Sequence, residues 1–175
     1  SAAFGVLLSS SVLIAADNES PHWEYTGDIG PAHWGELSKD WSTCSTGQSQ
    51  SPIDIKFSGA MQGDGIMLDY KPSSITVVNN GHTIQQNVDA GSTMQSGGST
   101  YDLVQFHFHS PSEHTFNGKH FPLEVHLVHS DKEGNLAVVG VMLEEGDANE
   151  TLEKVWQVMP EKADMTTTSN QSLNA

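Results

Sequence analysis

The sequence has few basic side chains and almost no cysteine. Its 175 residues include 7 lysine and arginine residues against 22 aspartate and glutamate residues, a formal net charge of −15 at pH 7. Nucleic acids and anionic membranes attract basic surfaces and repel acidic ones, so neither is an expected partner. Cys44 is the single cysteine. It has no second cysteine beside it, so a structural zinc site closed by cysteine ligands is disfavoured.

The sequence also lacks an apolar run of about 20 residues, the length that crosses a membrane. Residues 1–16 are apolar and uncharged, and polar residues begin abruptly at Asp17. This pattern is typical of the apolar core of a secretory signal peptide, with cleavage near Ala16; a buried N-terminal strand is the alternative. Because no initial methionine or basic segment precedes the run, we expect the sequence to begin inside the signal. We predict a periplasmic or secreted protein without stable membrane insertion.

Residues 17–175 are predicted to form one domain. A hydrophobic content of 36% and a mean hydropathy of −0.37 are ordinary for a globular protein, and the length is sufficient for one core. Apolar residues recur at helical spacing in residues 149–159, where Asn149 is the expected N-cap and Pro160 ends the helix. Most other patterned segments are short and rich in β-branched residues, which predicts a mainly β domain with few short helices.

The sequence predicts the local structure of three further segments. Residues 136–143 are almost continuously apolar, which predicts a strand buried on both faces. Residues 91–100 are rich in glycine and serine and predict a loop. Residues 166–175 are polar and predict a tail without a closing element.

Two short runs contain the candidate metal ligands. In a strand over Gln105–His109, alternation places His107 and His109 on one face and both phenylalanines on the other. Residues 121–129 also form a predicted strand, and pairing of the two strands brings His126 to the first two imidazoles. Three neutral nitrogens at one point form a zinc site with an open fourth position, which is typical of catalytic zinc. We therefore predict Zn²⁺ as the cofactor.

Side chains that orient such ligands are also present. Gln105 and Glu124 each precede a histidine by two residues and share its face, so they are expected to orient His107 and His126. Glu113 is a further carboxylate close in sequence. An isolated His-x-His pair would be interpreted instead as two hydrogen-bonded histidines on a half-exposed face. The third histidine and its partners favour the metal site.

Eight segments together resemble the α-class carbonic anhydrases, especially the bacterial, exported members. They are His22–Tyr25, Gly30–Trp34, Gly47–Ile55, Asn79–Thr83, Gln105–His109, Ser112–Thr115, Glu124–His129 and Leu136–Val141. The segments follow the family order, and together they are very specific. The resemblance implies a large twisted central sheet of mixed direction with zinc at the bottom of a conical cleft. It also implies reversible hydration of carbon dioxide to bicarbonate and a proton, through attack of zinc-bound hydroxide on CO₂. A homodimer is compatible with it.

The resemblance implies roles for residues around the zinc. Glu113 orients the hydroxide through a threonine that this sequence lacks. Val128 and Val138 form the apolar wall beside CO₂, although each is equally a core valine from sequence alone. His82 is the implied proton shuttle, because an imidazole that titrates near pH 6.5 can pass on a proton; a plain surface histidine is the alternative.

The resemblance also assigns Tyr25, Asn80 and Gln85 to the cleft and its water network. Family members continue beyond the position of residue 175, so the domain is expected to be truncated and its sheet incomplete. The continuation contains the hydroxide-orienting threonine and a cysteine that would pair with Cys44. A buried free thiol or an intermolecular disulfide is the alternative for Cys44.

Two other function classes compete with carbonic anhydrase. A catalytically silent relative that only binds zinc would usually lack a zinc histidine, and here all three are present. A zinc hydrolase acting on esters or peptides would be expected to contain a His-Glu-x-x-His motif, which is absent. The sequence therefore favours the enzyme.

Overall fold

The computed structural model describes residues 20–56 and 65–175, which fall into two compact units divided after Gln48. The predicted signal segment, residues 1–16, lies outside the described residues. The N-terminal unit contains short helices: η1 (Gly27–Ile29), α1 (Trp34–Leu37), η2 (Lys39–Trp41) and α2 (Thr43–Thr46). Aromatic rings pack edge to face within this unit. The ring centroids of Trp23 and Trp34, for example, are 5.1 Å apart.

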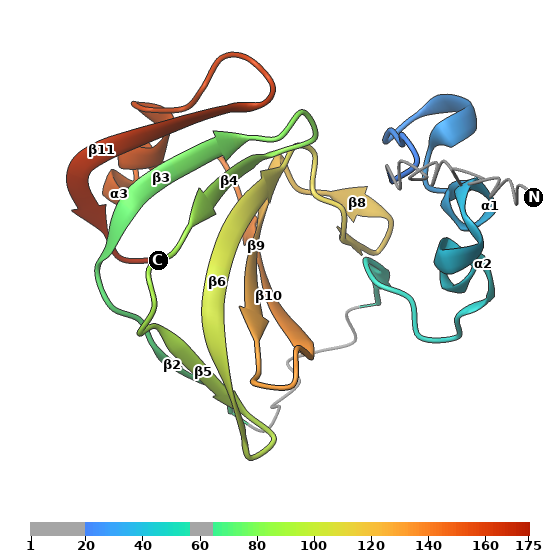
Figure 1. Cartoon of the computed structure of the whole chain (residues 1–175), viewed down its shortest axis with the longest axis horizontal. Helices are drawn as coiled ribbons and strands as arrows, with labels where there is room; N and C mark the ends of the chain where they lie inside the picture. Colours follow the sequence, from blue (N-terminus) through green and yellow to red (C-terminus); the bar gives the residue numbers. More distant parts are fainter. Residues whose placement is uncertain (1–19, 57–64) are drawn as a thin grey trace, which may run out of the picture. The chain divides into compact units, whose positions relative to one another are not determined.

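The second unit is built on an eight-stranded sheet that Figure 1 shows as a strongly twisted layer. Its strands are β2 (Met67–Asp69), β3 (Ser73–Asn79), β4 (Ile84–Asn87), β5 (Thr93–Ser96), β6 (Ser99–His109), β9 (Leu123–Ser130), β10 (Leu136–Leu143) and β11 (Met165–Leu173). The main path runs β10-β9-β6-β4-β3-β11, and β5 joins β2 to β6. A smaller sheet contains β1 (Asp54–Ile55), β7 (Thr115–Phe116) and β8 (Lys119–His120).

The predicted fold class, a mainly β domain with few short helices, is confirmed. The strand direction needs a correction. All described pairings in the large sheet are antiparallel. Among the described residues, parallel pairing is limited to β1 with β7 in the small sheet. The mixed direction implied for the large sheet is therefore not found in its described part.

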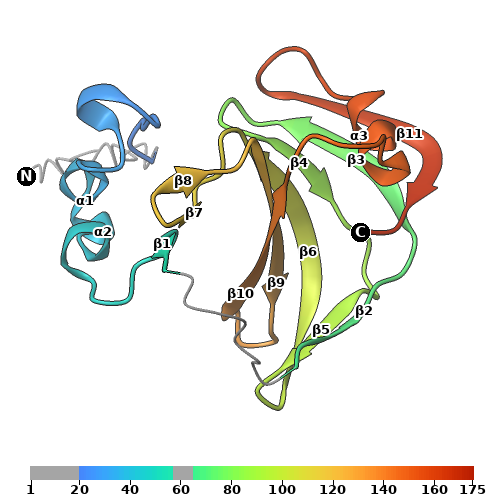
Figure 2. The same ribbon diagram turned by 180° about the vertical axis from the view of Figure 1, so that it is seen from behind.

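The core lies on one face of the large sheet. Phe106 and Phe108 of β6 point to this face and are buried among aliphatic side chains of β3 and β9. Helix α3 (Glu150–Trp156) covers part of this face, because Val155 belongs to the same buried cluster and the ring of Trp156 lies 4.5 Å from that of Phe108. Figure 2 shows the same strands from behind. As predicted, the side chain of Asn149 caps the helix.

Two segments predicted to lack regular structure contain strands. Within residues 91–100 lies β5, joined to β6 by Gly97 and Gly98, whose φ angles of 58° and 84° suit a tight hairpin turn. Residues 166–175 contain most of β11, which pairs with β3 and buries Leu173. Polarity did not reveal this strand because most of its side chains face outward, and backbone pairing requires no apolar residue.

Strand β10 has the predicted bounds but not the predicted burial. It lies at the end of the sheet path, and the side chains of Leu136 and Val138 are 68% and 52% exposed. A continuous apolar run predicts a strand without fixing whether a second strand lies on each side. Within the two described ranges, no helix has the length and apolar character needed to cross a membrane.

Candidate metal centre

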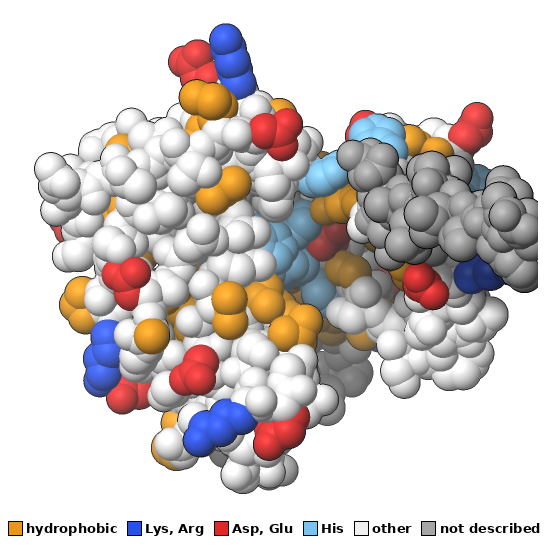
Figure 3. All heavy atoms as spheres, in the orientation of Figure 1, with side chains coloured by type: hydrophobic (Ala, Val, Ile, Leu, Met, Phe, Trp, Pro, Cys, Tyr) orange, Lys and Arg blue, Asp and Glu red, His pale blue; other side chains and the backbone are white. Residues whose placement is uncertain are grey.

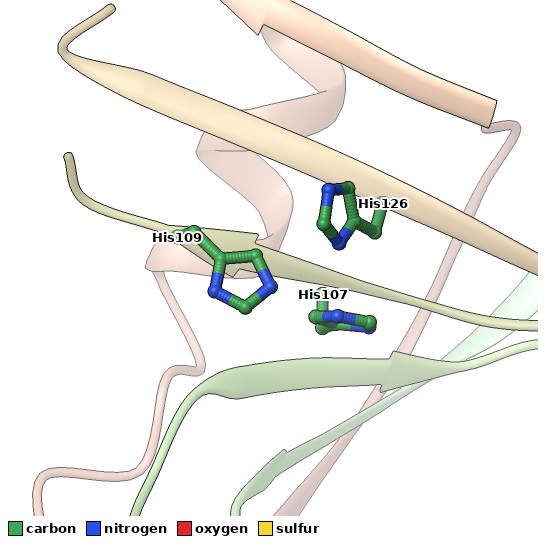
Figure 4. Close-up of side chains that lie close together, drawn as sticks. All are labelled: His107, His109 and His126. Atoms are coloured by element: carbon green, nitrogen blue, oxygen red, sulfur yellow. The ribbon is translucent and has the colours of Figure 1, made fainter. Parts of the chain in front are cut away.

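Three histidine side chains from two neighbouring strands converge on one point. His107 and His109 come from β6 and His126 from β9, and the register places His107 directly opposite His126. One nitrogen of each ring lies within 4.8 Å of the others, and the ring centroids are 4.7 to 5.3 Å apart. Figure 4 shows the rings turned toward a common space. The structure thus brings together the three predicted ligands.

Hydrogen bonds fix the tautomers of two of these rings. Nδ1 of His107 donates to Oε1 of Gln105 over 2.9 Å, and Nε2 of His126 donates to Oε1 of Glu124 over 2.8 Å. An amide or carboxylate oxygen only accepts here, so the proton is on the bonded nitrogen. In the neutral form of each ring, the lone pair is therefore on Nε2 of His107 and on Nδ1 of His126. This arrangement is usual for imidazoles that bind a metal through one nitrogen.

The carboxylate of Glu124 is held on every side. Its side chain has no exposed surface, and Oε1 also accepts from Nδ1 of His114 over 2.6 Å. Oε2 accepts the backbone N–H groups of Glu113 and His114 over 2.9 and 3.0 Å. Burial alone would raise the pKa of Glu124, but the hydrogen bonds from His114 and His126 outweigh it and lower the pKa. The carboxylate is therefore ionised at neutral pH.

The side chain of Glu113 reaches the same space from the loop after β6. Its Oε2 lies 3.2 Å from Nε2 of His109 and 3.6 Å from Nδ1 of His126. Burial raises the pKa of this carboxyl, partly offset by the neighbouring His126. Glu113 thus places an acceptor beside the histidine nitrogens, where it can hold a proton or orient a polar group.

The imidazoles of β6 are neutral at physiological pH. Burial, followed by the proximity of His126, lowers the pKa of both His107 and His109 to about 4. Neutral imidazole is the form that binds metals. Three converging imidazoles, two of them oriented by hydrogen bonds, match the donor set of a catalytic zinc site.

An open pocket of about 460 Å³ adjoins the cluster. It is lined by Ser51, Pro52, Ile55, Glu113, His114, Phe116, His126, Val138, Gly140 and Met142. Val128 of β9 stands opposite Val138 of β10, two residues along from His126, so both valines lie on the histidine face. In Figure 3, histidine atoms gather at one place on the surface with hydrophobic side chains close by. The pocket therefore combines polar and apolar walls.

Comparison with known proteins identifies the family. The family model for eukaryotic-type carbonic anhydrase matches residues 29–174. The chain belongs to the α-carbonic anhydrase family. A carbonic anhydrase of Pectobacterium carotovorum is 44% identical over 158 residues, which cover 90% of this chain and 65% of that protein. One from Neisseria gonorrhoeae is 43% identical over 156 residues, 89% of this chain and 62% of that protein.

A solved structure agrees with the sequence comparisons. The α-carbonic anhydrase of Thermovibrio ammonificans, in complex with the inhibitor sulfanilamide, superposes with a TM-score of 0.79 and 46% identity. The match covers 84% of this chain and 66% of that chain. This member of the α-carbonic anhydrase family therefore spans just under two thirds of the length of the curated relatives named above.

The predicted cleft residues lie in different surroundings. Gln85 of β4 stands opposite His107 and donates a hydrogen bond to Asn87 over 2.7 Å, so it borders the histidine face. Oδ1 of Asn80 accepts the backbone N–H groups of His82 and Thr83 and closes the turn before β4. His82 lines a second hollow together with Phe108 and Trp156. The strand register thus brings Gln85 to the border of the histidine face, and the shuttle role of His82 stays a prediction.

Two predicted residues belong to the N-terminal unit. Tyr25 packs edge to face against Trp23 and Trp34. Cys44 lies in α2 and is an exposed free cysteine, in the wall of a small hollow with three tryptophans. Their predicted roles in the cleft and in a disulfide stay predictions.

Sequence reasoning missed Gly140. It stands directly opposite His126 in the β9–β10 ladder and lines the pocket. A glycine within an otherwise apolar, β-branched strand was a usable signal, because such a position often marks a close approach by another group. The group itself becomes evident only once the register is known.

Proposed function

We propose that the protein catalyses the reversible hydration of carbon dioxide to bicarbonate and a proton, with Zn²⁺ held by His107, His109 and His126. The proposal is carried by the convergence of three imidazoles, two of which are oriented by hydrogen bonds to Gln105 and Glu124. Zinc held by three imidazoles would lower the pKa of a bound water to about 7 and so would supply a nucleophile at neutral pH. Membership of the family supports the reaction.

In this proposal the chain's own residues orient the imidazoles, accept a hydrogen bond beside them and supply an apolar surface for the substrate. Gln105 and Glu124 hold two imidazoles in their metal-binding tautomers. The carboxylate of Glu113, 3.2 Å from the ring of His109, is positioned to accept a hydrogen bond from a group that orients the nucleophile. Val128 and Val138 offer apolar surface on the same face, which suits an uncharged, apolar substrate.

Two proposals concern the proton and the location. We assign the transfer of the released proton to His82 by family resemblance, because an imidazole can accept a proton and pass it on. Asn80 holds the turn that carries His82 through its bonds to two backbone N–H groups. Export to the periplasm or the exterior is supported by the apolar, uncharged residues 1–16.

Metal analysis and stopped-flow CO₂ hydration test the proposal. We expect about one zinc per chain, activity that a chelator abolishes and added zinc restores, and loss of both zinc and activity in His126→Ala. His22→Ala is the matched control, because that imidazole is exposed with a side chain 73% accessible. Full zinc content without CO₂ hydration would favour a zinc-binding module instead. Absence of zinc from the purified protein would refute the metal centre.

A further inference from the structure

Gly140 occupies a position in β10 where a side chain would be expected. The flanking residues, Val139 and Val141, are β-branched, and glycine weakens a strand interior. Its φ is not among the positive values of this chain, so the backbone conformation admits any residue there. Space, not conformation, therefore explains the glycine.

The carboxylate of Glu124 fills that space. A Cβ atom on Gly140 would lie 3.0 Å from Oε1 of Glu124 and 3.8 Å from Cδ2 of His126. The first distance is shorter than an ordinary van der Waals contact, so one of the two groups must move. Oε1 is the same atom that accepts the hydrogen bond from Nε2 of His126.

The carboxylate has little room to withdraw. Oε1 is held by Nδ1 of His114 at 2.6 Å, and Oε2 by the backbone N–H groups of Glu113 and His114 at 2.9 and 3.0 Å. Displacing it would lengthen several charge-assisted hydrogen bonds in a buried site. The bond to His126 is the one that orients a candidate zinc ligand.

We propose that Gly140 is a positioning residue of the metal centre: the absence of a side chain on β10 lets the Glu124 carboxylate lie against His126 and hold its ring toward the metal. This inference rests on the zinc site proposed above. According to this inference, a third strand, β10, supports the metal centre in addition to β6 and β9, which carry the ligands. It also predicts that a methyl group at residue 140, without changing any ligand, weakens zinc binding.

Zinc affinity measured by competition with a chelator tests the inference. We expect Gly140→Ala to bind zinc about 10-fold or more weakly than the wild type, the usual range for loss of a ligand-orienting contact. The d–d spectrum of the Co²⁺-substituted protein should also shift. Gly146→Ala is the matched control, because a Cβ there would meet nothing within 4 Å. Its zinc affinity and cobalt spectrum should equal those of the wild type.

A double-mutant cycle with Glu124→Asp separates positioning from general destabilisation. Aspartate is one methylene shorter, so its carboxylate does not reach the added methyl group. We expect Gly140→Ala to change zinc affinity less than about 2-fold in the Glu124→Asp background. An equal loss in both backgrounds would overturn the inference, and so would an unchanged affinity in the single variant. If Gly140→Ala does not fold, a folded double variant supports the contact and an unfolded one overturns it. A wild type without zinc affinity would refute the proposed function and the inference with it.

Discussion

The carboxylate of Glu124 accepts four hydrogen bonds while its side chain has no exposed surface. A buried charge without partners costs several kcal/mol, so these donors are what allows the carboxylate to remain ionised there. The same bonds make it a rigid support. Its effect on His126 is therefore to orient the ring without adding a movable charge to the site.

The lowered pKa values of His107 and His109 predict an acid-sensitive metal-free protein. Both values are about 4 in the folded state, against about 6.5 in the unfolded chain. Between these values the unfolded state binds more protons, so stability rises with pH and is lost as pH falls from about 6.5 toward 4. We expect the urea midpoint of the metal-free protein to decrease as the pH is lowered from about 6.5 toward 4.

The matched variant for this prediction replaces both rings, His107→Asn and His109→Asn, which removes the two titrating groups. Its urea midpoint should change less between about pH 6.5 and pH 4.5 than that of the metal-free wild type. Identical pH dependence in the two proteins would show that other groups control the acid sensitivity.

On the scale of the element, β6 has two faces with separate tasks. Phe108 is 7% exposed and packs on Phe106 and Trp156, whereas its neighbours His107 and His109 face the other side. We expect Phe108→Ala to lower the free energy of unfolding by about 3–5 kcal/mol, the usual cost of removing a buried aromatic ring. Urea denaturation monitored by circular dichroism measures this loss.

Val104 supplies the control for this prediction on the same strand. Its side chain is 47% exposed, so Val104→Ala should cost less than about 1 kcal/mol, mainly through lower β propensity. Comparable losses in the two variants would contradict the assignment of the core to the phenylalanine face. Zinc binding in the absence of urea should persist in both variants, because neither residue is a candidate ligand or a hydrogen-bond partner of one.

The alternation in β6 was predictable because it depends on neighbouring residues alone. The period of two placed His107 and His109 together, and the second apolar run correctly suggested the strand of His126. What depends on register was not predictable. The contact of Gly140 with Glu124 requires knowledge of the residue that stands opposite on the adjacent strand. The exposure of β10 likewise depends on strand order, which a run of apolar residues does not encode.

The molecule as a whole carries a large negative charge, and this predicts a salt response. A net charge of −15 makes the compact state repel itself. Salt screens such repulsion over a Debye length of about 30 Å at 0.01 M and about 10 Å at 0.1 M. We therefore expect the melting temperature at neutral pH to rise with NaCl over this range. The pH must be kept neutral throughout, because acidification would also protonate the buried histidines.

Glu144 and Glu145 allow the same prediction to be tested within the chain. They are adjacent, exposed residues of like charge in the loop after β10, so Glu144→Gln/Glu145→Gln removes two units of charge without disturbing the core. This variant should melt at a higher temperature than the wild type at low salt, and its melting temperature should rise less as NaCl is added. Since the screened repulsion is what distinguishes the two proteins, their melting temperatures should converge at high salt. A difference that is independent of salt would mean that the substitutions act through local structure and that the net charge does not control stability.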